Sequence, residues 1–196
     1  MLVYSHNVKR TKNKIPGHIL KLYRKLRNID SIYVDTCFVG YLTDDDRHEE
    51  HGDLIVKYFQ NYNIKPYVSN LVLEELSALD NELDDTKKLK QMTKLLLKVL
   101  NDIGAVPVKN IKVTNEVKEF YEFLLNIGIT KNDAAHFTIT VFHDIDAFLS
   151  FNKKIFVKKK NKIDRKLMIL RKKPPVILEV DELYLDLKKL DKYNFI

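Results

Sequence analysis

The chain has 196 residues, a length that suits one domain with a sizeable core, and its 45% hydrophobic and 10% aromatic content argues against disorder. Its single cysteine, Cys37, excludes an intrachain disulfide framework and a cysteine-based zinc cluster; because no apolar run reaches signal-peptide or membrane-spanning length, we expect a soluble cytoplasmic protein without a membrane partner. The formal net charge of +7 makes an anionic partner plausible, although a lysine-rich background explains that charge equally well.

The first half of the chain predicts two strands that alternate with helices. Residues 1–30 form a basic N-terminal extension, in which "PGHILKLYRKLRNI" has the apolar spacing of a short helix. The run "SIYVD" predicts a strand buried on both faces, and "RHEEHGDLIVKYFQNYN" predicts a helix after it. A second strand follows in "KPYVS", and Ser69 is well placed to cap a helix through "NLVLEELSALD".

The second half continues the alternation. A helix is predicted in "DDTKKLKQMTKLLLKVLND", a strand weakened by Pro107 in "AVPV", and two helices in "VTNEVKEFYEFLLNIG" and "TKNDAAHFTITVFHDI". "DAFLS" is the fourth strand, and a lysine-dense loop from Lys153 to Lys173, with a short strand at residues 155–157, leads to a fifth strand in "PPVILEV" and a terminal helix in "DELYLDLKKL". This order predicts an α/β domain with a mainly parallel sheet.

Acidic side chains fall where such a sheet binds ligands. Asp35 ends the first strand, Glu75 lies in the helix after the second, Asp133 begins the helix before the fourth, and Asn152 follows the fourth. Ligands of open parallel sheets bind at the carboxyl ends of the strands. Carboxylates gathered there would repel one another unless a hard cation such as Mg²⁺ or Mn²⁺ were bound, and such a cation promotes phosphodiester hydrolysis.

Each acid also has a local explanation. Asp35 can end its strand by accepting backbone N–H groups, Glu75 can be an ordinary helical glutamate, and Asp133 can complete a capping-box-like pattern with Thr130. Taken singly, these local explanations are the stronger ones. The same reasoning favours a packed, hydrogen-bonded His136 over a metal ligand.

The ordered set of segments is more specific than any single one. "YVDTCFVGYL", "VSNLVLEELSAL", "NDAAHFTITV" and "DIDAFLSFNKKIF" resemble the signature segments of PIN-domain proteins of the VapC-like kind, over residues 31–157. The resemblance implies a three-layer α/β/α sandwich and an RNA-cleaving site that binds Mg²⁺ or Mn²⁺. It identifies Asp35, Glu75 and Asp133 as the metal-site residues and Thr36 as the residue that orients Asp35. Residues 158–196, with the last strand and helix, would complete the same domain.

Two positions depart from that family pattern. Asn152 stands where many relatives have a fourth acid, and Ile155 stands where relatives with Asn usually have a later Asp. An amide oxygen can assist a cation but brings no charge, so a second metal position would be weaker than the first. Asp146 is a substitute candidate, but it precedes the fourth strand, and we interpret it mainly as a structural residue. Cys37 is expected to be buried filler and not a nucleophile.

A basic segment beside the acids would be needed to hold a polyanion. The residues proposed for RNA binding are Lys153, Lys154, Lys158, Lys159 and Lys160. The alternative is a solvated loop that keeps the protein soluble.

The leading hypothesis is therefore a metal-dependent endoribonuclease, either the toxin of a toxin–antitoxin pair or an RNA-processing enzyme. One alternative is a catalytically weak PIN-like RNA-binding scaffold. Another is an aspartyl phosphotransferase, disfavoured because "DTCFVG" lacks a second acid two residues after Asp35. An antitoxin protein and a homodimer are partners that the resemblance leaves open.

Overall fold

The computed structural model describes residues 15–41, 46–72, 74–75, 100–109 and 111–196. Its elements in chain order are α1 Gly17–Arg27, β1 Ser31–Val34, α2 Thr36–Tyr41, α3 Asp46–Asn61, β2 Lys65–Val68, β3 Val106–Pro107, α6 Asn115–Asn126, α7 Lys131–Phe142, β4 Ala147–Leu149, α8 Lys153–Ile169, β5 Val176–Leu178 and α9 Val180–Asp191. Residues 70–72, 74–75 and 100–102 are also helical. No helix of the described ranges is long and apolar enough to cross a membrane.

The strands form one parallel sheet, as the sequence predicts. The strand order is β3-β2-β1-β4-β5, and every pairing between neighbours is parallel. In the central strand, Tyr33 lies opposite Tyr67 of β2 and Phe148 of β4. Ile32, Tyr33 and Val34 have no exposed surface, because β1 is paired on both edges and covered on both faces.

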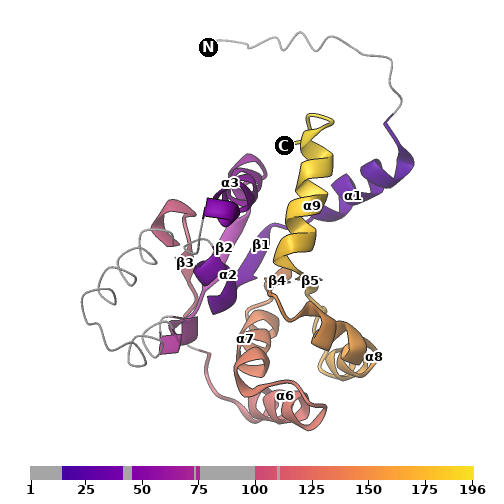
Figure 1. Ribbon diagram of the computed structural model, residues 1–196. Coiled ribbons are helices and arrows are strands. Elements are labelled where there is room, and N and C mark those ends of the chain that lie inside the picture. The colour runs from indigo at the N-terminus through magenta and orange to yellow at the C-terminus, as the bar shows by residue number, and fades with distance from the viewer. Residues whose placement is uncertain (1–14, 42–45, 73, 76–99, 110) are drawn as a thin grey trace, which may run out of the picture.

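Helices cover both faces of this sheet (Figure 1). Helices α3 and α9 pack against each other on one side, and α1 packs against α9. Helices α6 and α7 pack together on the other side. There the rings of Phe137 in α7 and Phe156 in α8 lie 5.6 and 5.4 Å from the ring of Phe148. The predicted three-layer α/β/α architecture is thus confirmed.

Part of the basic N-terminal segment belongs to the core. Ile19 and Leu26 of α1 are buried, and the Tyr58 hydroxyl donates a hydrogen bond to the Leu26 carbonyl. The ring of Tyr23 stacks on Phe195 near the C-terminus, with 4.4 Å between centroids. Residues 1–14 of the predicted extension lie outside the described residues.

The predicted lysine-dense loop with a strand at residues 155–157 is wrong. Residues 153–169 form the helix α8. Phe156, Ile163 and Leu167, seven and four residues apart, are its buried residues, so the segment carries a helical apolar stripe. Lysine has a good helix propensity, and a helix buries these three apolar side chains, which an open loop would leave exposed.

The other predicted elements agree with the structure where it describes them. Thr130 begins α7, and Gly128 before it has a φ of 86°, a conformation that glycine adopts without steric cost. The helix predicted after Ser69 is described only to residue 75. Most of the helix predicted in "DDTKKLKQMTKLLLKVLND" lies outside the described residues.

Candidate active site

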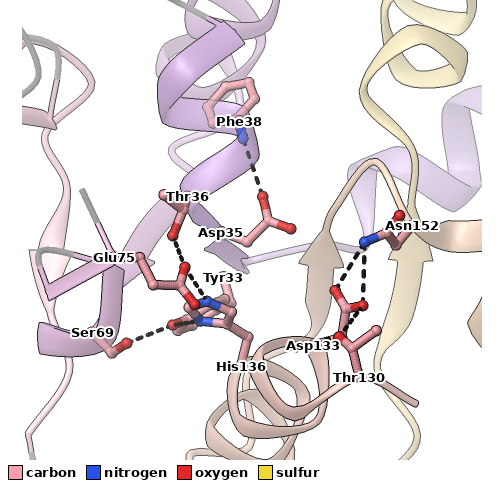
Figure 2. Close-up of polar contacts among 10 residues, drawn as sticks. All are labelled: Tyr33, Asp35, Thr36, Phe38, Ser69, Glu75, Thr130, Asp133, His136 and Asn152. Carbon is pink, nitrogen blue, oxygen red and sulfur yellow. Dashed lines mark hydrogen bonds and ion pairs between the residues drawn. The ribbon is translucent and has the colours of Figure 1, made fainter. Parts of the chain in front are cut away.

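The predicted acids gather at the carboxyl edge of the sheet. Strand β1 has β2 on one side and β4 on the other, so the chain order reverses around it, and ligands of such sheets bind at this position. Asp35 follows β1 directly, and the segment after β4 brings in Asn152. In the close-up, Asp35 lies between a group formed by Thr36 and Glu75 and a group formed by Asp133 and Asn152 (Figure 2).

Asp35 is buried and caps the short helix α2, which the sequence did not predict. Asp35 is 3% exposed, and its Oδ1 accepts a hydrogen bond of 3.1 Å from the Phe38 backbone N–H. Burial raises the pKa of Asp35, while hydrogen bonds from Ser150 and Phe38 act in the opposite direction. The local explanation from the sequence, a carboxylate that accepts backbone N–H groups, therefore holds beside any role in the site.

Glu75 is held by side chains from two other segments. Its Oε2 accepts hydrogen bonds from the Thr36 hydroxyl and from His136 Nε2, the latter at 3.0 Å. Burial alone would raise the pKa of Glu75, but the hydrogen bonds from His136 and Thr36 outweigh it and lower the pKa. The other oxygen, Oε1, is buried and has no hydrogen-bond partner among the described residues. An unpartnered buried carboxylate oxygen is costly unless a ligand completes it.

A buried polar chain continues behind Glu75. The Nδ1 atom of His136 lies 2.7 Å from the Tyr33 hydroxyl, which lies 2.6 Å from Ser69 Oγ. His136 and Ser69 are 3% and 7% exposed. The residues come from α7, β1 and the end of β2, and the dashed lines of Figure 2 trace the chain.

Asp133 is fixed at the first turn of α7. The Thr130 hydroxyl donates to Asp133 Oδ2 at 2.8 Å and accepts from the Asp133 backbone N–H at 3.3 Å. The Asn152 amide Nδ2 lies 3.2 Å from both carboxylate oxygens of Asp133. Asn152 thus donates N–H groups to Asp133, whereas the sequence suggested that its amide oxygen would assist a cation.

The negative charges of all three acids affect the pKa of Cys37. Cys37 lies on α2 and is exposed, so the prediction of a buried residue is wrong. Desolvation, followed by the negative charges of Asp35, Asp133 and Glu75, raises the pKa of Cys37 to about 11. A thiol with so high a pKa is a poor nucleophile at neutral pH.

The donors present suit a hard divalent cation. They are oxygens, and they include the buried, unpartnered Oε1 of Glu75. Within the described ranges, however, no three His, Cys, Asp or Glu side chains lie as a ready-made metal-holding group. Each carboxylate is drawn to its own protein donors, Asp35 to Phe38 and Glu75 to Thr36. Mg²⁺ commonly retains several waters and binds through one or two carboxylates, so these residues fit such an ion without three direct ligands.

Asp146 lies at the opposite edge of the sheet, as its place before β4 predicts. Its carboxylate accepts hydrogen bonds from the Ser31 hydroxyl at 3.0 Å and the Asp30 backbone N–H at 3.3 Å. Lys173 forms an ion pair with it at 3.0 Å. These contacts tie the start of β1 to the start of β4, away from the other acids.

The lysines proposed for RNA binding divide into two groups on α8. Lys153 pairs with Glu182 of α9, and Lys160 pairs with Asp164 one turn along the same helix. The other three, Lys154, Lys158 and Lys159, form no ion pair with another described residue.

Sequence reasoning missed the polar chain of Ser69, Tyr33 and His136. His136 was interpreted as a packed residue, and it is buried and hydrogen-bonded, but its partner is a candidate metal-site residue. The signal available was its position three residues after Asp133 on the same helix, which alone could not indicate contacts with Glu75 and Tyr33, 61 and 103 residues away.

Comparison with protein-family models and with curated proteins gives no match for this chain. Among solved structures, the chain is similar to the crystal structure of VapBC2 from Rickettsia felis bound to a DNA fragment from their promoter. The sequence identity is 15%, the TM-score is 0.47, and the similarity covers 76% of this chain and 98% of the other. A similarity at that level carries no argument about function, so the PIN-domain resemblance remains a prediction.

Proposed function

We propose that this protein is a Mg²⁺- or Mn²⁺-dependent endoribonuclease whose site is formed by Asp35, Glu75 and Asp133, with Asn152 and Thr36 as supporting residues. One observation carries the proposal. Three acids from remote parts of the chain lie at the carboxyl edge of β1 and its neighbours, and one of them has a buried oxygen without a hydrogen-bond partner among the residues that the structure describes. A buried carboxylate oxygen that lacks a partner in the protein is costly, and a bound cation would offset that cost.

The protein's side chains divide the work of such a site. Glu75 and Asp35 would hold the cation, and Asp133, fixed by Thr130 and Asn152, would supply further negative charge beside it. When bound, the cation would neutralise charge on the scissile phosphate and acidify water. The buried setting of Asp35 strengthens electrostatic interactions there relative to bulk water.

Helix α8 supports RNA as the substrate. It begins directly after Asn152, so its positive end faces the site and favours a phosphate there. Lys154, Lys158, Lys162 and Arg165, spaced four, four and three residues apart, form an exposed stripe opposite the buried residues of the helix. We name these four residues the α8 basic stripe. A polyanion that follows this stripe would reach the acids at its N-terminal end.

Cleavage of a generic RNA panel with Mn²⁺ tests the proposal. The wild-type protein should cut RNA and Asp35→Asn should not, with Asp53→Asn as a control that removes the same charge from an exposed position on α3. Equal cleavage by the wild type and Asp35→Asn would mean that the activity is a contaminant. Covalent phosphate on Asp35 would instead indicate a phosphotransferase.

A specific observation favours the second candidate, an RNA-binding scaffold with weak or no catalysis. Asn152 brings no charge and binds Asp133 through its amide nitrogen, and the described acids form no ready-made metal group. A scaffold would bind RNA through α8 with an affinity that does not depend on Mn²⁺. It would leave RNA intact even at high protein concentration.

The cellular role is a further part of the proposal. As a toxin, the nuclease would arrest growth when expressed alone, and an antitoxin protein would relieve the arrest. As an RNA-processing enzyme, it would be tolerated. Expression from a tightly controlled promoter, in wild-type and Asp35→Asn forms, separates these roles, because only cleavage-dependent toxicity disappears in the variant.

A further inference from the structure

The hydrogen bonds behind Glu75 join side chains from three remote segments of the chain. An ionised Glu75 can only accept, so His136 Nε2 must donate to it. The other ring nitrogen, Nδ1, is hydrogen-bonded to the Tyr33 hydroxyl at 2.7 Å. The Tyr33 hydroxyl is in turn hydrogen-bonded to Ser69 Oγ at 2.6 Å.

Burial keeps these contacts away from water. The Tyr33 hydroxyl lies between His136 Nδ1 and Ser69 Oγ, at 2.7 and 2.6 Å. The Tyr33 side chain has no exposed surface, and His136 is 3% exposed, so water cannot replace either partner. The ring orientation of His136 is therefore set by Tyr33 of β1, which Ser69 after β2 holds in turn.

Both donors to Glu75 bind the same oxygen. His136 and the Thr36 hydroxyl each donate to Oε2, while the buried Oε1 has no hydrogen-bond partner among the described residues. A carboxylate held in this way loses little further side-chain freedom when it binds a ligand. Outer hydrogen-bond partners of metal ligands act in this manner, and they commonly account for about 10–100-fold in metal affinity.

We infer that His136, oriented by Tyr33 and Ser69, is a positioning residue that fixes the Glu75 carboxylate at the proposed metal site. This inference rests on the proposed metal site, but it does not require that the site cleave RNA. His136 itself touches neither cation nor substrate in this arrangement.

Direct Mn²⁺ binding to the full chain tests the inference, with the free ion followed by its electron paramagnetic resonance signal. His136→Leu should weaken Mn²⁺ binding by about 10–100-fold. His136→Gln, whose amide N–H can still donate to Glu75, should retain most of the affinity. Tyr33→Phe keeps the buried ring, removes only the hydroxyl, and should weaken binding by a smaller factor; it decides the question if His136→Leu does not fold.

Thr138→Val is the matched control. Thr138 lies on α7, is 4% exposed, and donates only to the Ala134 carbonyl of its own helix at 2.7 Å. Its replacement should leave Mn²⁺ affinity unchanged whatever it does to the melting temperature. A residue with a purely structural role would behave like Thr138, with stability altered and affinity intact.

The possible outcomes separate the inference from the proposed function. Equal Mn²⁺ affinity of the wild type and a folded His136→Leu overturns the inference, even if the wild type cleaves RNA. Loss of affinity in His136→Leu with recovery in His136→Gln supports the inference, even if no RNA in the panel is cleaved. Failure of the wild type to bind Mn²⁺ overturns both.

Discussion

The proposed role of Asp35 in the site conflicts with the stability of the fold. It is 3% exposed, and burial raises its pKa, so the fold favours its protonated form. A group whose pKa is higher in the folded than in the unfolded state contributes stability below its unfolded pKa. That contribution is lost as the pH rises through the folded pKa. At neutral pH, an ionised Asp35 therefore weakens the fold that positions it.

We predict that Asp35→Asn raises the melting temperature at pH 7 while it abolishes Mn²⁺-dependent activity. The amide oxygen can still accept from the Phe38 N–H, and the amide nitrogen can donate to Ser150, so the neutral side chain suits the same pocket. Each kcal/mol of relieved desolvation would raise the melting temperature by about 2–4 °C. Thermal scans from acid to neutral pH should show the advantage growing as the pH rises.

The control for this prediction is Asp53→Asn. It makes the same change in net charge at an exposed position, so it should leave the melting temperature nearly unchanged at every pH. An Asp35→Asn variant that melts below the wild type at pH 7 would contradict the prediction.

Single residues also show how far the sequence could predict the site. Asp35 and Asp133 were found because each stands beside a strong local signal, a strand end and a helix start. Glu75 has no such signal, because an ordinary exposed glutamate in a helix has the same local pattern. The role of His136 could not be found, because its hydrogen bonds join segments that no local pattern connects, and Ser69 was recognised only as a helix cap.

Thr130 allows the capping and site roles of Asp133 to be separated. We predict that Thr130→Val destabilises the protein by about 0.5–2 kcal/mol, the usual cost of a lost N-cap, and also weakens Mn²⁺ binding because Asp133 loses a hydrogen bond. Thr114→Val removes the equivalent cap of α6, whose hydroxyl accepts from the Val117 N–H. It should cost similar stability in urea unfolding and leave Mn²⁺ binding unchanged.

Equal effects of the two threonine variants on Mn²⁺ affinity would show that Asp133 is only a capping residue. Thr130→Ser keeps the hydroxyl and should behave like the wild type in both measurements.

At the scale of elements, α8 is where sequence reasoning failed most. The run Ile155-Phe156-Val157 has the β-branched and aromatic character of a strand, and the dense lysines around it suggested a loop. The helical pattern in the sequence rests on the spacing of Phe156, Ile163 and Leu167 alone. This apolar stripe is sparse, and most of the positions between its members are charged. The strands were easier to predict, since β1 and β4 are short, continuous apolar runs with acids or turns at their ends.

The helix changes what the lysines can do, because it places part of them on one face. We predict that replacing Lys154, Lys158 and Lys162 of the α8 basic stripe with Gln flattens the salt dependence of RNA binding. Each phosphate contact contributes about −0.7 to the slope of log affinity against log salt for a single strand, so loss of three would reduce the slope by about 2. Binding would be measured by fluorescence anisotropy over a range of salt concentrations.

The control is a second triple variant, in which Lys65, Lys172 and Lys173 are replaced with Gln, so that the same amount of positive charge is lost. Lys65 begins β2, and the other two pair with Asp144 and Asp146 before β4, so all three lie toward the opposite edge of the sheet. These replacements should lower RNA affinity only slightly and retain the steep slope. Equal slopes for the two triple variants would remove α8 from the RNA interface.

At the scale of the whole molecule, the two edges of the sheet differ in what their acids contribute. Asp35 at the carboxyl edge has a raised pKa because it is buried. At the amino edge, burial acts on Asp146 in the same direction, but the hydrogen bonds from Lys173 and Ser31 outweigh it and lower the pKa. The first acid therefore opposes folding when ionised, whereas the second supports it.

We predict that Asp146→Ala lowers stability at pH 7 without changing Mn²⁺ affinity or RNA cleavage. The variant loses hydrogen bonds from the Ser31 hydroxyl and the Asp30 N–H to a charged group, and such bonds contribute about 1.5–3 kcal/mol each. Because the pKa of Asp146 is lowered by folding, its contribution is present above the unfolded pKa and is lost as the pH falls through the folded pKa. The difference from the wild type should therefore shrink in acid.

Combining Asp146→Ala with Asp35→Asn tests whether the two edges act independently. The residues lie at opposite ends of β1 and share no partner, so their effects on the free energy of unfolding should add within about 0.3–0.5 kcal/mol. Their pH dependences have opposite signs and partly cancel in the wild type. Each single variant should therefore tilt the stability profile between acid and neutral pH in the opposite sense, and the profile of the double variant should lie between those of the two single variants. Strong coupling in urea unfolding, or loss of Mn²⁺ binding in Asp146→Ala alone, would mean that the amino edge sets the geometry of the candidate site through β1.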